Sequence, residues 1–169
     1  MKNKTKVLQV GDPRLREKAI PVEIISHEIR ATLDEMVAAM FASEGAGLAA
    51  PQLGLGLRMF VVRIAAGGEV LKIINPKLTG FSDDEITMEE GCLSVLGPDG
   101  PVYANVVRPS TIRLNWQDED GNERDAVFDG IAARIIQHEF DHLEGVLFID
   151  HVSALRRTMI MSKVKKAQQ

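Results

Sequence analysis

The chain has 169 residues, of which 45% are hydrophobic and 26% charged. These proportions are typical of a folded globular protein, so we expect one domain over residues 1–169 and no disordered chain. The longest uncharged stretch, residues 45–57, is shorter than the roughly 20 apolar residues of a membrane span, so no membrane partner is expected. Cys92 is the only cysteine, which rules out an intrachain disulfide and favours a reducing compartment.

The net charge of −4 is unevenly distributed. The segment 151–169 has no acidic side chain and five basic ones: Arg156, Arg157, Lys163, Lys165 and Lys166. The net charge therefore divides into +5 for this segment and −9 for residues 1–150. An acidic body argues against sequence-specific nucleic-acid binding, whereas the basic segment is either a solvated helix face or a site of attraction for an anionic partner. No signal or transit peptide is evident at the N-terminus, so we expect a cytoplasmic protein.

The first third of the chain predicts a short strand at residues 6–10 and then a helix. Ser26 is suited to cap the helix N-terminus. The apolar residues that follow are spaced as on one helical face: Ile29, Leu33, Met36, Val37, Met40 and Phe41. The helix should end before Gly45, because residues 45–56 contain too much glycine for a regular helix.

The rest of the chain predicts strands followed by two helices. Five strands are expected, at residues 59–64, 70–74, 86–89, 112–116 and 124–128. The first two are separated by a turn at 65–68, and the last two by DEDGN at 118–122, a strong hairpin signal. Helices are expected at 130–143 and, with the basic residues, at about 153–166. Because turns rather than helical crossovers join the strands, we predict an α+β fold with antiparallel sheets.

The segment HEFDH has the HExxH pattern. On a helix, His138 and His142 lie on one face and can bind the same metal ion, with Glu139 beside them, able to contact bound water without being a ligand. Ile131 and Ile135 share this apolar face, so we expect both histidines to point toward the core, where imidazoles need partners. The alternative is an exposed helix that carries two histidines by chance.

Two histidines leave such a site incomplete, since catalytic zinc-type sites usually have three protein ligands. The downstream candidates are Glu144, Asp150 and His151, of which Glu144 is expected to face elsewhere. Upstream, the thiolate of Cys92 in EGCLS is a candidate, although a lone cysteine is more often part of the core.

The stretch GAGLAAPQ matches neither a phosphate-binding loop nor a dinucleotide fingerprint. It is either a flexible connection or a loop whose glycines let another backbone approach, with the Gln52 amide as a hydrogen-bond donor.

Three motifs occur together in this order: GAGLAAPQ at 45–52, EGCLS at 90–94 and QHEFDH at 137–142. Together they closely resemble the signature motifs of the peptide deformylases. This resemblance implies a metal-dependent hydrolase that removes the N-formyl group from the N-terminal methionine of new polypeptides. It also implies antiparallel sheets packed around a central helix that carries both histidines. Family members often have proline where this chain has Leu96, and the longer loop 96–101 is expected to reshape the rim of the substrate cleft.

The resemblance also implies residue roles. The metal ligands would be Cys92, His138 and His142, with Fe²⁺ as the physiological ion and Zn²⁺, Ni²⁺ or Co²⁺ as replacements. Glu139 would be the acid/base, and the Gln52 amide and the Leu93 N–H would hold the formyl oxygen. An extended substrate is expected to add as a strand along Gly45, Ala46, Gly47 and Leu48 and near Gly91. Ile131 and Ile135 are our candidates for the wall of the methionine slot.

Two other functions stay open at this point. One is an HExxH metallopeptidase that cuts internal peptide bonds, against which the Cys92 motif argues. The other is a deformylase-like, non-catalytic protein that binds the ribosome, against which the intact Glu139 and Gln52 argue. The basic helix at 153–166 is a candidate ribosome contact for a catalytic protein as well.

Overall fold

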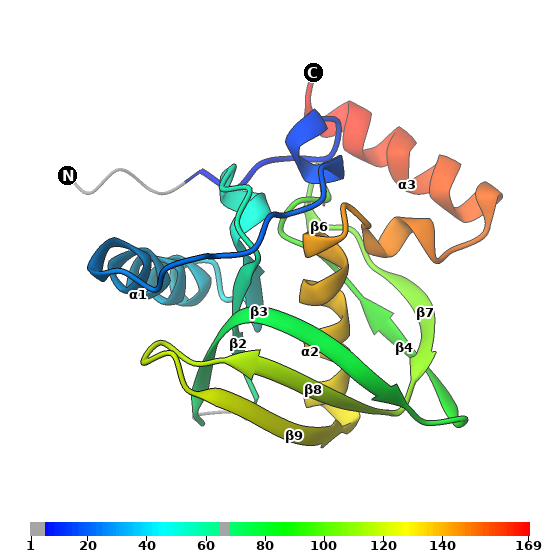
Figure 1. The fold of residues 1–169 in the computed structure, drawn as a ribbon. Helices are drawn as coiled ribbons and strands as arrows, with labels where there is room; N and C mark the ends of the chain where they lie inside the picture. The colour runs from blue at the N-terminus through cyan, green and yellow to red at the C-terminus, as the bar shows by residue number, and fades with distance from the viewer. Residues whose placement is uncertain (1–5, 65–67) are drawn as a thin grey trace.

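The structure is a computed structural model that describes residues 6–64 and 68–169 (Figure 1). Its three α-helices are α1 (His27–Ala42), α2 (Gly130–Leu143) and α3 (Ala154–Ala167). The strands of the described residues are β1 (Gly47–Ala49), β2 (Met59–Arg63), β3 (Val70–Phe81), β4 (Glu85–Glu90), β5 (Leu96–Gly97), β6 (Gly100–Pro101), β7 (Ala104–Pro109), β8 (Thr111–Gln117) and β9 (Glu123–Asp129). Short 3₁₀ helices form at Pro13–Arg16 (η1), Ala50–Leu53 (η2) and Phe148–Asp150 (η3). None of the helices in these ranges is long and apolar enough to cross a bilayer.

The strands form antiparallel sheets, as the sequence predicts. The largest has the order β1-β2-β3-β8-β9, while β4 pairs with β7 and β5 with β6. Helix α2 lies between the five-stranded sheet and the β4–β7 pair (Figure 1). The α+β architecture with a central helix is therefore confirmed. Strand β1 is an edge strand, and its free edge faces away from β2.

The core consists of three clusters of buried hydrophobic residues, one of which includes residues of α2 and another residues of α1. Ala133, Ile136 and Leu143 of α2 pack with buried residues of the five-stranded sheet such as Phe60 and Leu114. Beyond β4–β7, a second cluster joins Cys92 and Val106 to Phe148, Ile160 and Val164. The third cluster joins Leu33, Met36 and Met40 of α1 to Leu48, Met59, Val61 and Ile74. Since burying one such side chain contributes roughly 1.5–3 kcal/mol, the contacts of the first cluster hold α2 against the five-stranded sheet.

Several expected elements are confirmed in detail. The Ser26 hydroxyl accepts a hydrogen bond from the backbone N–H of Ile29 at 3.4 Å and caps α1, which ends at Ala42. The predicted hairpin, strand pairs and helices 130–143 and 153–166 all form. Phe41 is the exception on the predicted apolar face: it is 47% exposed, and the Arg63 guanidinium lies over its ring at 5.7 Å. The predicted turn at 65–68 lies largely outside the described residues.

Other predictions were wrong. Residues 6–10 form no strand, because their backbone bonds run to two separate segments: the Leu8 N–H donates to the carbonyl of Gln52 in η2, and the Val10 N–H to that of Ser94 in the loop after β4. Strand β3 runs beyond the predicted residue 74 to Phe81, with register irregularities that follow Ile74 and Leu78. The sequence also missed β7, and the predicted loop 96–101 contains the β5–β6 hairpin.

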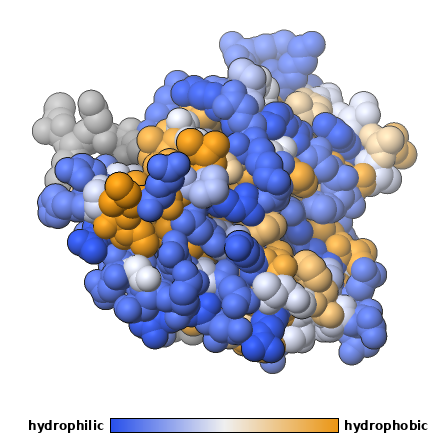
Figure 2. Space-filling view, in the orientation of Figure 1, coloured by the Kyte–Doolittle hydropathy of each residue, from blue (hydrophilic) through white to orange (hydrophobic). Residues whose placement is uncertain are grey.

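The surface seen in this orientation is largely hydrophilic (Figure 2). Hydrophobic side chains gather on it in the region where the chain leads into α1 (Figures 1 and 2). Two residues of that leading segment, Ile20 and Ile24, are strongly exposed.

Candidate active site

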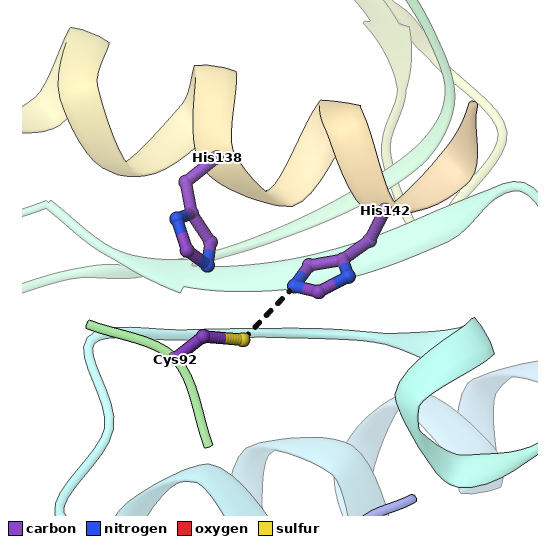
Figure 3. A group of neighbouring side chains, drawn as sticks. All are labelled: Cys92, His138 and His142. Atoms are coloured by element: carbon purple, nitrogen blue, oxygen red, sulfur yellow. Dashed lines mark hydrogen bonds between the residues drawn. The ribbon is translucent and has the colours of Figure 1, made fainter. Parts of the chain in front are cut away.

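Three metal-ligand side chains converge between α2 and the loop that follows β4 (Figure 3). His138 and His142 lie one helical turn apart on α2, and Cys92 points toward them from the loop. Their ligand atoms all lie within 4.8 Å of one another, and the Cys92 Sγ–His142 Nε2 distance is 3.4 Å. One thiolate and two imidazoles form a donor set that binds zinc, iron(II), cobalt or nickel. The cluster therefore fits a divalent metal ion.

The other candidate ligands are engaged elsewhere. Asp150 pairs with Arg16, and Glu144 pairs with Lys18 and Arg58. His151 is hydrogen-bonded to Asp141 at 2.7 Å, away from the cluster. Cys92, which sequence reasoning left as either a ligand or a core residue, is thus the side chain that completes the cluster.

His138 is oriented by a buried carboxylate that the sequence analysis missed. Glu90 Oε2 lies 2.9 Å from His138 Nδ1, so the other ring nitrogen faces the cluster. Arg108 holds Glu90 through two bonds of 2.7 and 3.1 Å, and Arg134 adds one of 2.8 Å. Burial opposes the charge on Glu90, but the bonds to His138 and Arg108 lower its pKa well below the usual value. The only feature of the sequence that could have indicated this role is the position of Glu90, two residues before the candidate ligand Cys92.

Glu139 has a different environment. It is 4% exposed, and its Oε2 atom has no hydrogen-bond partner among the described residues. Burial raises its pKa to about 7, more than the attraction of His138 lowers it. A carboxyl group with such a pKa can both accept and donate a proton near neutral pH. Gly47 makes room for it, because a Cβ at Gly47 would overlap Glu139 Oε1 and lie 2.7 Å from Cγ.

Gln52 is positioned by its own turn. Its Oε1 accepts a bond from the Ala49 N–H at 2.9 Å, which directs the NH₂ group toward Cys92 Sγ at 3.5 Å and Ser94 Oγ at 3.1 Å. The amide donor expected from the sequence therefore lies beside the cluster. Leu93 lies between Cys92 and Ser94 in the chain, and its carbonyl oxygen accepts a hydrogen bond from the Gln9 side-chain amide at 2.9 Å.

A pocket of about 530 Å³ opens onto these groups. It is lined by most of the predicted substrate residues, namely Gly45, Ala46, Gly47, Gly91, Ile131 and Ile135, and by Gln52, Cys92, Leu93, His138 and Glu139. Leu48 is fully buried and does not line it. Both histidines are largely buried, as expected, but Ile131, which also lines the pocket, is 56% exposed and does not point into the core.

The chain is similar to known proteins over nearly its whole length. The profile of the family described as polypeptide deformylase matches residues 4–158. A peptide deformylase of Zymomonas mobilis is 44% identical over 170 residues, covering 96% of this chain and 94% of that one. A solved peptide deformylase from Legionella pneumophila has a TM-score of 0.90 and 36% identity, covering 96% of this chain and 94% of that one. The Ehrlichia chaffeensis enzyme in complex with actinonin has a TM-score of 0.91 and 35% identity, covering 97% of both chains.

Proposed function

The chain belongs to the peptide deformylase family, and we infer that it hydrolyses the N-formyl group from the N-terminal methionine of newly synthesised polypeptides. The reaction breaks the formyl C–N bond with water and yields formate and a free amine. The observation that carries this function is the cluster of Cys92, His138 and His142 beside the buried carboxyl group of Glu139, at a pocket that Cys92, His138 and Glu139 line.

We propose that Cys92, His138 and His142 hold one metal ion, with Fe²⁺ as the physiological ion. The donor set supports Fe²⁺, Zn²⁺, Ni²⁺ and Co²⁺ alike, and the choice of iron rests on the family resemblance. When bound, a divalent ion supplies Lewis acidity and lowers the pKa of a bound water molecule toward neutrality.

Glu139 would take the proton of the attacking water and pass it to the leaving amine. Its near-neutral pKa supports this role, and so does its Oε2 atom, which has no hydrogen-bond partner in the part of the chain that the structure describes. Negative charge then develops on the former formyl oxygen. The Gln52 NH₂ group and the Leu93 N–H would donate hydrogen bonds to that oxygen, and the bond from the Ala49 N–H holds Gln52 ready to do so.

The substrate backbone would pair with the free edge of β1. Gly45, Ala46, Gly47 and Gly91 all line the pocket, so an extended peptide could bond to backbone groups there with little regard to its sequence. Ile131 and Ile135 would form part of the apolar slot for the methionine side chain.

The decisive experiment measures formate release from a formyl-Met-Ala-Ser peptide together with metal content by elemental analysis. Release of formate with an intact peptide is expected, in proportion to bound metal. Cleavage within a longer peptide would identify a metallopeptidase instead. Metal-loaded protein that releases neither product would be a non-catalytic binding protein.

Glu139→Gln tests the acid/base role. Glutamine has nearly the same shape but cannot accept the proton, so we expect kcat to fall by about 10²- to 10⁴-fold at unchanged metal content. Near-normal turnover of fully loaded variant would refute the role.

We also propose that the protein works in the cytoplasm and that α3 brings it to the ribosome. Supporting this, α3 carries the five basic residues of the segment 151–169, whereas the rest of the chain is acidic. Ribosomal RNA is dense in phosphate, so basic side chains on α3 would be attracted to it.

A further inference from the structure

Residues 8–10 bond to both of the segments that carry the proposed donors to the formyl oxygen. The Leu8 N–H donates to the backbone carbonyl of Gln52 in η2 at 2.7 Å. The Val10 N–H donates to the carbonyl of Ser94, in the loop after β4, at 2.8 Å. Residues 8–10 do not line the pocket. They therefore tie η2 to the loop after β4 from outside the site.

The side chain of Gln9 adds a bond to this loop at Leu93. The Val95 N–H donates to the carbonyl of Cys92 at 3.0 Å, which closes a β-turn whose central peptide joins Leu93 to Ser94. The carbonyl of that peptide accepts a bond from the Gln9 amide at 2.9 Å, and its N–H donates to Cys92 Sγ at 3.4 Å. Since C=O and N–H point to opposite sides of a trans peptide, these two contacts fix its plane. The Gln9 bond thus opposes the flip of the central peptide by which the common turn types differ.

Gln9 is itself held in place. Its backbone carbonyl accepts a bond from the Asp12 N–H at 3.0 Å, and its side-chain amide also donates to the Val7 carbonyl at 3.3 Å. The neighbouring Val10 is buried, and its carbonyl accepts a bond from the side chain of Gln168, at the end of α3, at 3.3 Å. The amide of Gln9 therefore has a fixed anchor and a fixed direction.

The spacing between the two proposed donors is what this tie affects. The NH₂ group of Gln52 comes from η2 and the N–H of Leu93 from the loop after β4, yet both are proposed to reach one oxygen atom. Donors of this kind stabilise the developing charge when they lie about 2.7–3.1 Å from the oxygen. Since a misplacement of about 1 Å near the reacting atoms costs roughly 10²-fold in rate, bonds that fix one segment against the other matter for the chemistry.

We propose that Gln9 is a positioning residue, which acts through the Leu93 carbonyl to keep the Leu93 N–H at the spacing from the Gln52 amide that the reaction needs. This inference rests on the proposed function. The charge on the oxygen develops only as water attacks, so these donors act mainly on the transition state. Loss of the Gln9 bond should therefore lower kcat about tenfold at unchanged KM, which is less than the roughly 10²- to 10³-fold cost of removing a donor itself.

The test compares Gln9→Met, Gln9→His and Gln168→Met with the parent on formyl-Met-Ala-Ser, with kcat expressed per bound metal ion. Methionine has nearly the length of glutamine but no donor, and the site is only partly buried, so Gln9→Met should fold and show the fall in kcat. Histidine offers an N–H of similar reach and should restore most of the lost kcat. Gln168→Met removes a side-chain bond to the same segment without touching the Leu93 carbonyl, so it should be as active as the parent.

Four results would overturn the proposal. The first is a kcat per metal ion in Gln9→Met equal to that of the parent, and the second is a rise in KM at constant kcat, which would place the segment in substrate binding. The third is an equal fall in Gln168→Met, which would make the effect one of general support. The fourth is a Gln9→His variant no better than Gln9→Met, because donation would then not be what matters. If the parent itself released no formate, the proposed function would fail, and this inference with it.

Discussion

Glu139 shows how much a single residue's chemistry depends on a neighbour without a side chain. Its carboxyl group is buried, and burial raises its pKa to about 7. The carboxyl group occupies the space that a Cβ of Gly47 would fill. Glycine at this position therefore does more than leave the loop flexible: it lets the acid approach the pocket between α2 and β1.

Gly47→Ala is expected to displace the Glu139 carboxyl group. A misplacement of about 1 Å near the reacting atoms costs roughly 10²-fold in rate, so kcat should fall by about this factor with metal content unchanged. Steady-state kinetics with elemental analysis measure both. Gly56→Ala is the control, because a Cβ there meets nothing within 4 Å. Equal activity of the two variants would contradict this account of Gly47.

Cys92→Ser is expected to weaken metal retention, because a neutral hydroxyl replaces a thiolate. The variant should lose most of its metal on dialysis against a mild chelator under conditions in which the parent keeps it. Metal content by elemental analysis decides the matter. If the variant retained its metal fully, Cys92 would be a core residue that packs beside the site.

At the scale of elements, α2 is tied to the β4–β7 pair by charge as well as by packing. Glu90 of β4 bonds to Arg108 of β7, to Arg134 of α2 and to His138. Arg134 also donates to the backbone carbonyls of Val106 and Ile86, one on each strand. Because removing one partner of a buried ion pair leaves the others uncompensated, this network holds the helix that carries the histidines in one register against the strands.

The β8–β9 hairpin is stabilised by an ionised aspartate in its turn. Asp118 accepts bonds from the N–H groups of Asp120 and Asn122 at 3.0 and 2.9 Å and from Arg124 Nε at 2.8 Å. Burial opposes the charge, but these bonds lower the pKa of Asp118 to about 2. The folded pKa lies below the unfolded one, so this stabilisation is complete above about pH 5 and is lost as the pH falls toward 2.

Asp118→Asn should therefore lower the free energy of unfolding by about 1 kcal/mol at pH 7. This loss is smaller than the pKa shift alone would give, because water screens the partly exposed carboxylate. The difference from the parent should shrink as the pH falls from 5 to 2. Urea unfolding at several pH values measures it. Asp120→Asn is the control, since the Asp120 side chain makes no hydrogen bond within the described part of the chain. A loss of stability that does not change with pH would contradict the argument.

At the scale of the whole molecule, residues 1–150 carry a net negative charge, whereas the segment 151–169, which contains α3, carries a net positive charge. The five basic residues of the segment are not equivalent. Arg156 bonds to the carbonyl of Tyr103, and Arg157 pairs with Asp150, so both are engaged in the fold. Ile160 and Val164 anchor the buried face of α3, whereas its three lysines are exposed. A test of ribosome binding should therefore leave both arginines in place.

The triple variant Lys163→Gln, Lys165→Gln, Lys166→Gln should co-sediment less with ribosomes at low salt, with turnover of a short formyl-Met peptide unchanged. Loss of three phosphate contacts should reduce the slope of log K against log salt by about 2 to 3. Neutralising Lys6 and Lys77 instead should have little effect. If the triple variant and the parent co-sediment equally, or neither does, α3 only completes the fold.

Local structure and the type of chemistry could be predicted from the order of residues along the chain. Helix α1 with its Ser26 cap, the β8–β9 hairpin and the HExxH helix follow from spacing and turn residues, because these depend on neighbours in the chain. The three motifs also identified the family and the reaction, and they led us to expect Cys92, His138 and His142 as the metal ligands.

Only the tertiary structure decided what depends on contacts between distant residues. It brought Cys92 to the two histidines, buried Glu90 between two arginines, and placed Tyr103 on Gly91. It also bonded residues 6–10 to η2 and to the loop after β4, so that they form no strand, and it left Ile131 more than half exposed. Partners, burial and close packing between different segments of the chain have no periodic signature in the sequence, so local pattern cannot reveal them.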